Sequence, residues 1–183
     1  MASAMVGIHA AFTCADETIE AAAGLADDLG VGVHVHVAEG PDDRDAAKRL
    51  RRWVNDRWLL VHCVFLEDEL PGTIAHNPRS NMNNSVGYAN PARFANRIVL
   101  GTDGIGGDMA EEFRLAFAAH RQADLSASPD VAWSWLEAGR DLVPAARADR
   151  VTWAYPEADQ AWHMAYSPGA RPTDVWIGDR QVV

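Results

Sequence analysis

Val31-Gly-Val-His-Val-His-Val-Ala38 is the stretch of sequence that decides the fold. Valine recurs at every second position, which is the period of a β-strand, and β-branched residues favour an extended backbone. Amphipathic helical patterns lie on both sides of it. One begins at Asp16, its expected cap, and stops at Gly30, and the other opens at Pro41 and extends to about Asn55. A strand between two helices indicates a fold that alternates the two elements.

The same alternation continues from residue 5 to about residue 122. Short runs that are apolar on both faces and separated by helices indicate a parallel sheet covered on both sides, so we expect the α/β class. The expected strands are Met5–Phe12, Val31–Ala38, Leu59–Val64, Thr73–His76 and Arg97–Thr102, and a helix is expected over Met109–His120.

The pattern changes beyond residue 125, where Pro129–Gly139 predicts one more helix. Short alternating runs rich in Trp and Val follow, separated by Gly and Pro turns, and they indicate a small antiparallel β element. These expected strands are Arg150–Tyr155, Thr173–Ile177 and Gln181–Val183. We therefore expect an α/β domain over residues 1–140 and a β domain over residues 141–183.

Composition narrows the classes of partner. The 183 residues include 16 Lys and Arg against 26 Asp and Glu, a formal net charge of −10, which argues against nucleic acid and anionic membrane surfaces. No apolar run reaches the ~18 residues of a membrane span, and the N-terminus lacks the basic region of a signal peptide. The two cysteines, Cys14 and Cys63, are expected to pack as small hydrophobic residues in a reducing cytoplasm.

Each expected strand of the α/β part ends in a side chain that can bind a metal or move a proton. Parallel strands bring their carboxyl ends to one rim, where active sites form. A lone strand histidine is more often a hydrogen-bonded structural residue, but a whole set is hard to explain by core packing, because each buried polar group needs a partner. The set comprises His9, His36 with Glu39, His62, His76 and Asp103.

Other polar features have plainer interpretations. His34 shares a strand face with His36 but lies one pleat deeper, and His120 and His163 are expected to be packing or surface residues. The glycine-rich run from Gly101 to Asp108 matches no phosphate-binding pattern, and it fits a metal- or water-binding carboxylate at Asp103 better. The run from His76 to Gly87 is dense in amides and hydroxyls, a composition that favours a surface loop.

Together these motifs resemble the metal-dependent amidohydrolase superfamily, in the branch of cytosine and guanine deaminases and chlorohydrolases, and most closely its SsnA-type aminohydrolases. The resemblance covers residues 5 to about 122 and continues more weakly to the end. It rests on Gly7-Ile-His-Ala-Ala-Phe-Thr13, His34-Val-His-Val-Ala-Glu39, Leu60-Val-His-Cys63, His76-Asn-Pro-Arg-Ser-Asn-Met-Asn-Asn84 and Leu100-Gly-Thr-Asp-Gly104.

The resemblance implies part of a (β/α)8 TIM barrel, about strands four to eight, followed by a portion of the family's small β-sandwich. It implies His36 and Asp103 as metal ligands. It also implies catalytic roles for Glu39, His62 and Asp103, and substrate contacts from His9 and Asn81.

The chemistry implied is hydrolysis of a non-peptide C–N bond, most simply deamination of an amino-substituted heterocycle, a small-molecule substrate. Bound Zn²⁺ or Fe²⁺ would lower the pKa of its water from the high value of bulk water to about 7. Glu39 would then move protons to the ring nitrogen and the leaving amine, a role commonly worth about 10²–10⁴ in rate.

The sequence departs from the family pattern in two ways. The family's first strand carries a His-x-His pair of metal ligands, and no such strand precedes His9, so His36 and Asp103 are the only two ligands implied where three or four are usual. The strand-end residues His9, His36, His62, His76 and Asp103 are successively 27, 26, 14 and 27 residues apart. A complete barrel would have roughly 31 residues in each strand–helix unit. The short step predicts that a one-turn helix or a bare loop joins the strands ending at His62 and His76, or that the chain carries an internal deletion.

Two hypotheses follow. In the first, the chain is a C-terminal portion of an amidohydrolase whose complete form deaminates a heterocycle. In the second, it is a non-catalytic remnant or binding module, whose exposed sheet edge invites self-association as a homo-oligomer. A homodimer would not restore the first-strand ligands.

Overall fold

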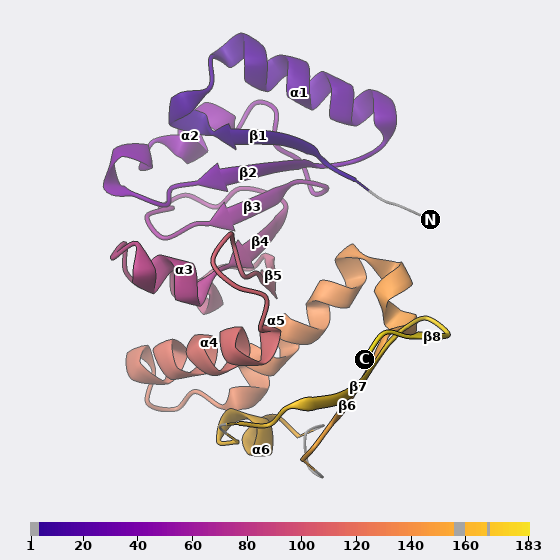
Figure 1. Ribbon diagram of the computed structural model, residues 1–183. Coiled ribbons are helices and arrows are strands. Elements are labelled where there is room, and N and C mark those ends of the chain that lie inside the picture. Colours follow the sequence, from indigo (N-terminus) through magenta and orange to yellow (C-terminus); the bar gives the residue numbers. More distant parts are fainter. Residues whose placement is uncertain (1–3, 156–159, 168) are drawn as a thin grey trace. The chain divides into compact units, whose positions relative to one another are not determined.

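The computed structural model describes residues 4–155, 160–167 and 169–183. The chain divides into two compact units, one ending at Gly107 and one extending from Asp108 to Val183, and each is described by itself. Figure 1 shows their helices and strands along the chain. Among the described residues, no helix combines the length and the apolar character needed to span a bilayer.

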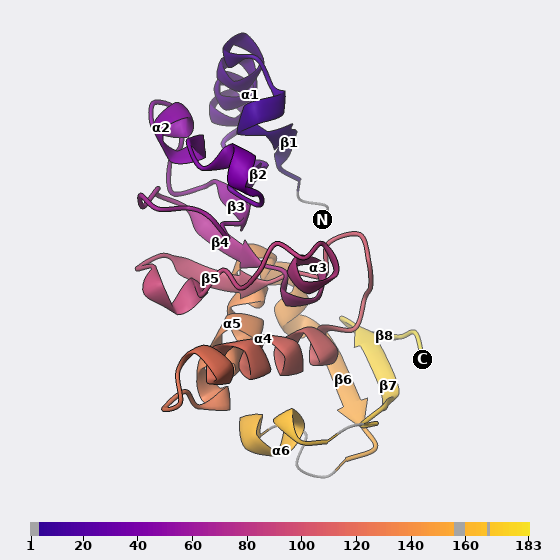
Figure 2. The same cartoon turned by 90° about the vertical axis from the view of Figure 1, so that its left-hand side faces the viewer.

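The first unit is built on a five-stranded sheet in which the strands follow one another in sequence order. Each neighbouring pair is parallel, which confirms the predicted parallel sheet and the α/β class. In Figure 2, which faces the strand ends, the strands succeed one another from β1 to β5. They are β1 (Val6–Ala10), β2 (Val33–Val37), β3 (Leu59–His62), β4 (Thr73–His76) and β5 (Arg97–Leu100).

In strand β2 the alternation of valine and histidine in the sequence separates the two residue types onto opposite faces of the sheet. Val33, Val35 and Val37 are fully buried, whereas the histidines between them are half-buried on the opposite face. The register of β2 on β3 sets His36 beside Val61 and Val37 beside His62. The valines of β2 therefore pack in the hydrophobic core. Its histidines lie on the opposite face, and His36 is the one nearer the carboxyl end of the strand.

Helix α1 (Asp16–Leu29) follows β1 and contacts β1 and β2. Its end is as predicted, because Gly30 adopts the left-handed conformation with φ of 67° and its N–H bonds back to the last turn. The predicted cap is wrong: Ala15 occupies the cap position, and Asp16 is the first helical residue. The Asp16 carboxylate instead accepts hydrogen bonds from Arg49 and Arg52.

The predicted helix from Pro41 to Asn55 is also wrong in extent. A 3₁₀ turn, η2 (Pro41–Asp43), and a short helix, α2 (Ala46–Leu50), take its place. The physical reason is the Asp43 side chain, which turns inward and accepts the Ala38 N–H at 2.7 Å. An aspartate that bonds to neighbouring backbone competes with the helix ladder and interrupts it.

The connection between β3 and β4 runs over residues 63–72. Throughout this stretch, which the structure describes completely, the chain forms turns and bends without a helix. A bare loop, one of the predicted alternatives, therefore joins β3 to β4. It includes Leu66 and Leu70, which are buried and anchor it to the core.

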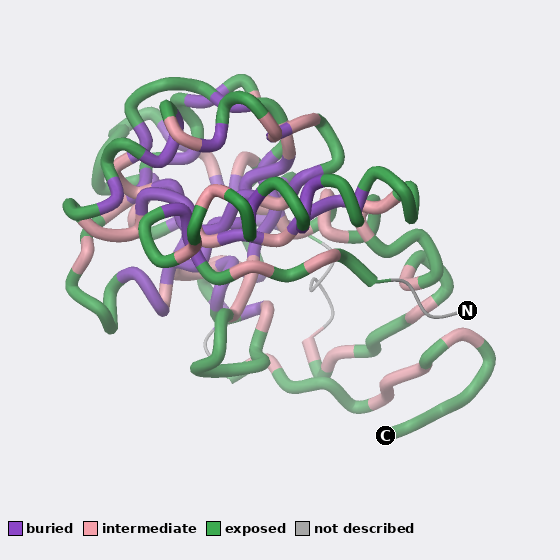
Figure 3. The backbone as a smooth tube through the Cα atoms, turned by 90° about the horizontal axis from the view of Figure 1, so that it is seen from above, coloured by how far each residue is buried: buried purple, intermediate pink, exposed green. Residues whose placement is uncertain are grey.

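The second unit pairs helices with a small antiparallel sheet. Helices α4 (Met109–Ala123), α5 (Pro129–Leu142) and α6 (Ala161–Ala165) contact one another, and the η4 turn (Pro144–Ala148) follows α5. The antiparallel strands β6 (Arg150–Trp153), β7 (Pro172–Ile177) and β8 (Arg180–Gln181) confirm the predicted β element. Every residue of these strands is half-buried or exposed (Figure 3).

Helix α4 begins at a side-chain cap, because Asp108 accepts the N–H groups of Ala110 and Glu111. His120 near its end is buried against Trp135, so it is a packing residue as predicted. Along the chain, the boundary between the two compact units falls after Gly107. The domain boundary expected at residue 140 was drawn from the change in sequence pattern, and it stays a prediction.

Candidate active site

Three imidazoles form a row across the carboxyl end of the parallel sheet. His9, His36 and His62 come from β1, β2 and β3, and neighbouring rings in the row have centroids 5.4 Å and 5.3 Å apart. Because parallel strands lie ~4.8 Å apart, residues at matching heights on adjacent strands meet in this way. The sequence prediction that these side chains share a rim is thus realised in the geometry.

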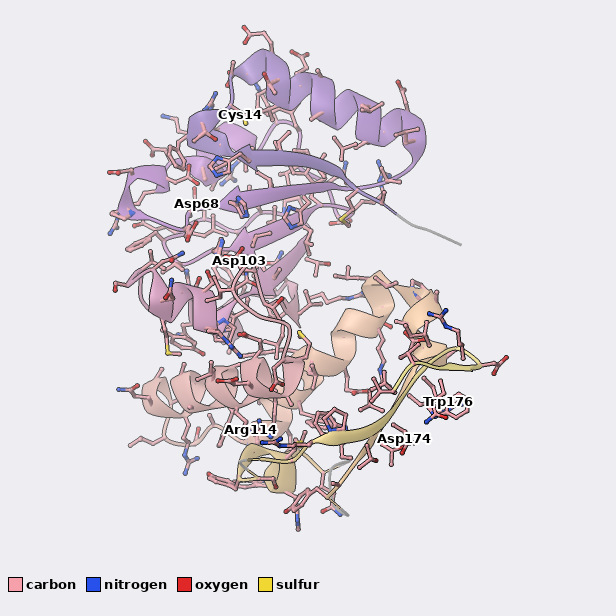
Figure 4. The ribbon with its side chains drawn as sticks, viewed as in Figure 1. Cys14, Asp68, Asp103, Arg114, Asp174 and Trp176 are labelled. Carbon is pink, nitrogen blue, oxygen red and sulfur yellow. The ribbon has the colours of Figure 1, made fainter. Side chains whose placement is uncertain are left out.

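Two carboxylates face the last imidazole of the row. Nε2 of His62 lies 3.6 Å from Glu39 Oε2 and 3.9 Å from Asp103 Oδ2. His62 is buried, whereas both carboxylate side chains are 32% exposed. Asp103 (Figure 4) stands on the loop after β5, and Glu39 on the loop after β2. His62 Nε2 and the two carboxylates are therefore close enough to contact the same small molecule.

The backbone at these strand ends is strained. His62 and Asp103 have φ of 72° and 53°, and Ala38, which precedes Glu39, has φ of 48°. Residues with a Cβ rarely adopt such angles, and each costs about 1–3 kcal/mol, so they persist where the surroundings impose them. Such outliers concentrate at functional sites. Sequence spacing carried no sign of this feature.

His9 is held by a local hydrogen-bond chain. The Thr13 hydroxyl donates to the Ala10 carbonyl at 3.1 Å, so its oxygen accepts from His9 Nδ1 at 2.7 Å. The neutral ring then carries its hydrogen on Nδ1 and presents Nε2 as an acceptor. Thr13 was missed as a site residue, although it stands within the quoted motif around His9.

The composition of the polar run after His76 predicted a surface loop, and this prediction is wrong. Residues Pro78–Asn83 form helix α3, with proline at the first position, where its missing N–H costs nothing. Figure 1 shows α3 on the side to which the arrowheads of β1 to β3 point. Ser80 and Asn81 are buried because they turn toward these strand ends.

Helix α3 contacts the predicted catalytic side chains through three hydrogen bonds. Ser80 and Asn84 were missed as site residues, and the signal that could have found them was their helical spacing after a proline. Asn81 bonds to the His62 imidazole, and its predicted contact with substrate stays a prediction. The bonds are Ser80 Oγ to Asp103 Oδ2 at 2.6 Å, His62 Nδ1 to Asn81 Oδ1 at 2.9 Å and Asn84 Nδ2 to Glu39 Oε1 at 3.0 Å.

Environment shifts two of the site's pKa values downward. Burial, followed by the neighbouring imidazoles of His62, His34 and His9, lowers the pKa of His36, so this ring favours its neutral, metal-binding form. The Ser80 hydrogen bond is the main cause that lowers the pKa of Asp103, with the Gly104 N–H and nearby imidazoles adding to it. Asp103 is therefore an anion at neutral pH.

His36 and Asp103 are side chains of the types that bind zinc or iron, but there are fewer of them than such a site needs. Neutral imidazole and carboxylate are ligands that zinc prefers, and three or more are usual. Across residues 4–155, 160–167 and 169–183, no three His, Cys, Asp or Glu side chains are arranged so that they could hold a metal ion. His36 and Asp103 alone do not make a complete site.

The other polar candidates lie away from this row or serve packing. His34 stacks edge-on to His36 with centroids 5.8 Å apart, one pleat deeper as expected. His76 is fully buried and its ring lies against Tyr88. Cys63 is buried, and burial raises the pKa of its thiol, so it packs as a small hydrophobe as predicted. Cys14 is half-buried.

A parallel sheet with imidazoles and carboxylates gathered at its carboxyl rim defines the class of α/β proteins whose polar sites lie at the strand ends. The sequence identifies the family within this class, because the model of the amidohydrolase family matches residues 1–140. The chain belongs to the amidohydrolase family.

Curated relatives carry deaminase names. The 5'-deoxyadenosine deaminase of Methanopyrus kandleri is 33% identical over 141 residues, covering 63% of this chain and 33% of the relative. The 5-methylthioadenosine/S-adenosylhomocysteine deaminase of Desulfitobacterium hafniense is 36% identical over 137 residues, covering 61% and 32%. This chain thus spans about a third of the length of the curated relatives it matches.

Solved structures support the fold. A zinc-bound adenosine deaminase from Xanthomonas campestris superposes with a TM-score of 0.81 at 24% identity, covering 96% of this chain and 50% of that one. The superposition therefore includes nearly the whole chain, and at this identity it is evidence for the fold.

Proposed function

We propose that this chain forms the second half of the catalytic rim of an amidohydrolase that deaminates an amino-substituted heterocycle. In this proposal the five-stranded sheet is an arc of a (β/α)8 barrel, corresponding to its strands four to eight. The observation that carries the proposal is His62 Nε2 facing Glu39 at 3.6 Å and Asp103 at 3.9 Å. The names of the relatives make 5'-modified adenosines the first substrates to examine.

The protein groups divide the proton transfers among them. The ionised Asp103 and the Nε2 lone pair of His62 share one hydrogen of the attacking water and orient its oxygen toward the amino-bearing ring carbon. Glu39 takes the other hydrogen as a proton while the water oxygen bonds to that carbon, and gives this proton to the ring nitrogen. Glu39 then takes the proton of the new hydroxyl group and gives it to the amino group, whose C–N bond breaks so that it leaves as ammonia. The proposal also assigns to His9 and Asn81 contacts with the ring or its substituent.

Zinc or iron remains the proposed cofactor, with His36 and Asp103 as its ligands in this chain. Because two ligands fall short of the usual number, the other donors have to come from polypeptide outside these residues. The catalytic steps above accordingly run through protein side chains alone.

The decisive experiment measures ammonia release from a panel of aminopurine nucleosides and aminopyrimidines, with zinc or iron added, by this chain and by any longer product of its gene. We expect release by the form that supplies the additional donors, and a loss of about 10²–10⁴-fold in Glu39→Gln. Glu67→Gln, which alters an exposed carboxylate, is the matched control. Failure of every form to release ammonia would overturn the proposal.

A non-catalytic, self-associating module is the second candidate. Two features of the described residues favour it: their donor set is incomplete, and among their strands β1 pairs with β2 alone, which leaves an edge for another strand. Sedimentation at two protein concentrations tests association. One equivalent of zinc in the purified chain, lost in His36→Ala, would count against this candidate.

A further inference from the structure

We propose that helix α3 is a positioning platform, on which Ser80, Asn81 and Asn84 each fix one of the three predicted catalytic side chains. The catalytic roles of Glu39, His62 and Asp103 rest on the proposed function. The platform itself rests on contacts that hold whatever the reaction is.

The three predicted catalytic residues come from three separate strand ends. Glu39 follows β2, His62 ends β3 and Asp103 follows β5, so no local segment of chain fixes one relative to another. Helix α3 touches all three within a single turn and its C-cap. Ser80 and Asn84 are separated by four residues and lie on one helix face, and Asn81 is the next residue around the helix.

The orientation of the Asn81 amide favours one tautomer of His62. Its Oδ1 lies 2.9 Å from His62 Nδ1 and can only accept, so in this orientation Nδ1 donates and the neutral ring presents its Nε2 lone pair to Glu39 and Asp103. Both partners are 1% exposed, so water does not compete for this bond. The amide nitrogen of Asn81 is buried without a hydrogen-bond partner among the described residues, so the His62 contact is the one that sets the amide's orientation. With the amide in this orientation, the opposite tautomer would leave a buried acceptor facing another acceptor, which costs free energy.

Ser80 and Asn84 act on the two carboxylates. The Ser80 hydroxyl donates to Asp103 Oδ2, while the Gly104 N–H donates to the other oxygen at 2.8 Å, so both oxygens are held. The Asn84 amide donates to Glu39 Oε1, which leaves Oε2 directed at His62. Asn84 Nδ2 also lies 3.5 Å from Ser80 Oγ, which links the two contacts.

The start of α3 is itself fixed against β5. Gly101 donates its N–H to the His76 carbonyl at 3.0 Å, which continues the sheet pairing past the strands. A Cβ added at Gly101 would lie 2.3 Å from Asn77 Oδ1, so the cap residue of α3 occupies the space that a side chain would take. The glycine lets the helix approach the strand that leads to Asp103.

The experiment is a long-range ¹H–¹⁵N correlation spectrum of the histidine rings in the whole ¹⁵N-labelled chain at pH 8, where ordinary imidazoles are neutral. We expect His62 to be the Nδ1–H tautomer in the wild type. In Asn81→Ala the ratio of Nδ1–H to Nε2–H forms should fall about 5–30-fold, which is about 1–2 kcal/mol. Asn81→Asp keeps an acceptor at the same place and should restore the Nδ1–H form.

Controls separate positioning from folding. Asn83→Ala removes an exposed amide from the same helix and should leave the His62 spectrum unchanged. If Asn81→Ala unfolds the chain, the His62 tautomer in the wild type and in Asn81→Asp still tests the proposal. An Nε2–H tautomer at His62 in the folded wild type, or an Asn81→Ala spectrum like the wild type's, would overturn the proposal.

A second measurement addresses the carboxylate side of the platform. Methylene relaxation of Glu39 in the ¹³C-labelled chain reports the order of its side chain. Asn84→Ala should lower that order and Met82→Ala, an exposed position on the same helix, should not. Equal order in both variants would remove Asn84 from the platform. Neither spectrum depends on turnover, so failure to find deamination and failure of the platform are separate results.

Discussion

Replacing Asp43 by alanine should destabilise the first unit by about 2–3 kcal/mol. The Asp43 side chain is 4% exposed, and its Oδ2 accepts the buried Ala38 N–H at 2.7 Å. The Phe12 backbone also hydrogen-bonds to it. Removing the side chain leaves the buried Ala38 N–H without an acceptor, which costs about 1–3 kcal/mol, and the lost bond to the Phe12 backbone adds to this cost. The loss also frees Ala38, whose strained φ of 48° precedes Glu39.

The pH dependence of this effect has a definite sign. Burial raises the pKa of Asp43 above its usual 3.8, so the folded chain binds this proton more tightly than the unfolded chain. The contribution of Asp43 to stability, measured against Asp43→Asn, should therefore be largest below pH 3.8 and should decline as the pH rises through the raised value. Ionisation of the buried carboxyl is the cause of the decline.

Urea unfolding followed by circular dichroism at several pH values measures both effects. Asp42→Ala, which removes the exposed neighbouring carboxylate, is the matched control and should change stability by less than about 0.5 kcal/mol. An Asp43→Ala variant as stable as this control would refute the reasoning, and so would a contribution of Asp43 that grows with pH.

Three further outcomes are expected. Hydrogen bonds from two arginines lower the pKa of Asp16, so Asp16→Asn should be less stable than the wild type at neutral pH, and this difference in urea midpoint should vanish as the pH falls through that lowered value. Gly101→Ala, whose Cβ would meet an oxygen at 2.3 Å, should lose about 1–3 kcal/mol, whereas Gly24→Ala, in open helical space, should gain up to about 1 kcal/mol in the same assay. Calorimetric titration with zinc of a form that supplies the additional donors should show binding that His36→Ala abolishes and His34→Ala retains; retention in both would exclude His36 as a ligand.

The α/β class and the rim could be predicted because both follow from local period. Alternating valines put His34 and His36 on one strand face, and parallel pairing then brings His36 to His62 with ring centroids 5.3 Å apart. Thr73–His76 was predicted with its observed bounds because apolar strand residues end there abruptly. These features depend on residues a few positions apart and on one general rule of parallel sheets.

Other features were predicted wrongly because they depend on residues distant in sequence. Asp16 looks like a helix cap until Arg49 and Arg52 approach it from 33 and 36 positions away. The helix expected after Pro41 is interrupted because Asp43 finds a buried backbone partner at Ala38. In both cases a tertiary contact outweighed the local preference of an aspartate.

The sequence by itself determined the strands, the order of the polar residues at their ends and the family to which the chain belongs, since these are properties of spacing along one chain. Only the tertiary structure decided that the amide-rich run is a helix with buried Ser80 and Asn81, and that its side chains hold residues 19, 23 and 45 positions away. The physical reason is burial: polar side chains shut away from water must find partners in space, and their position along the chain does not reveal which partners those are.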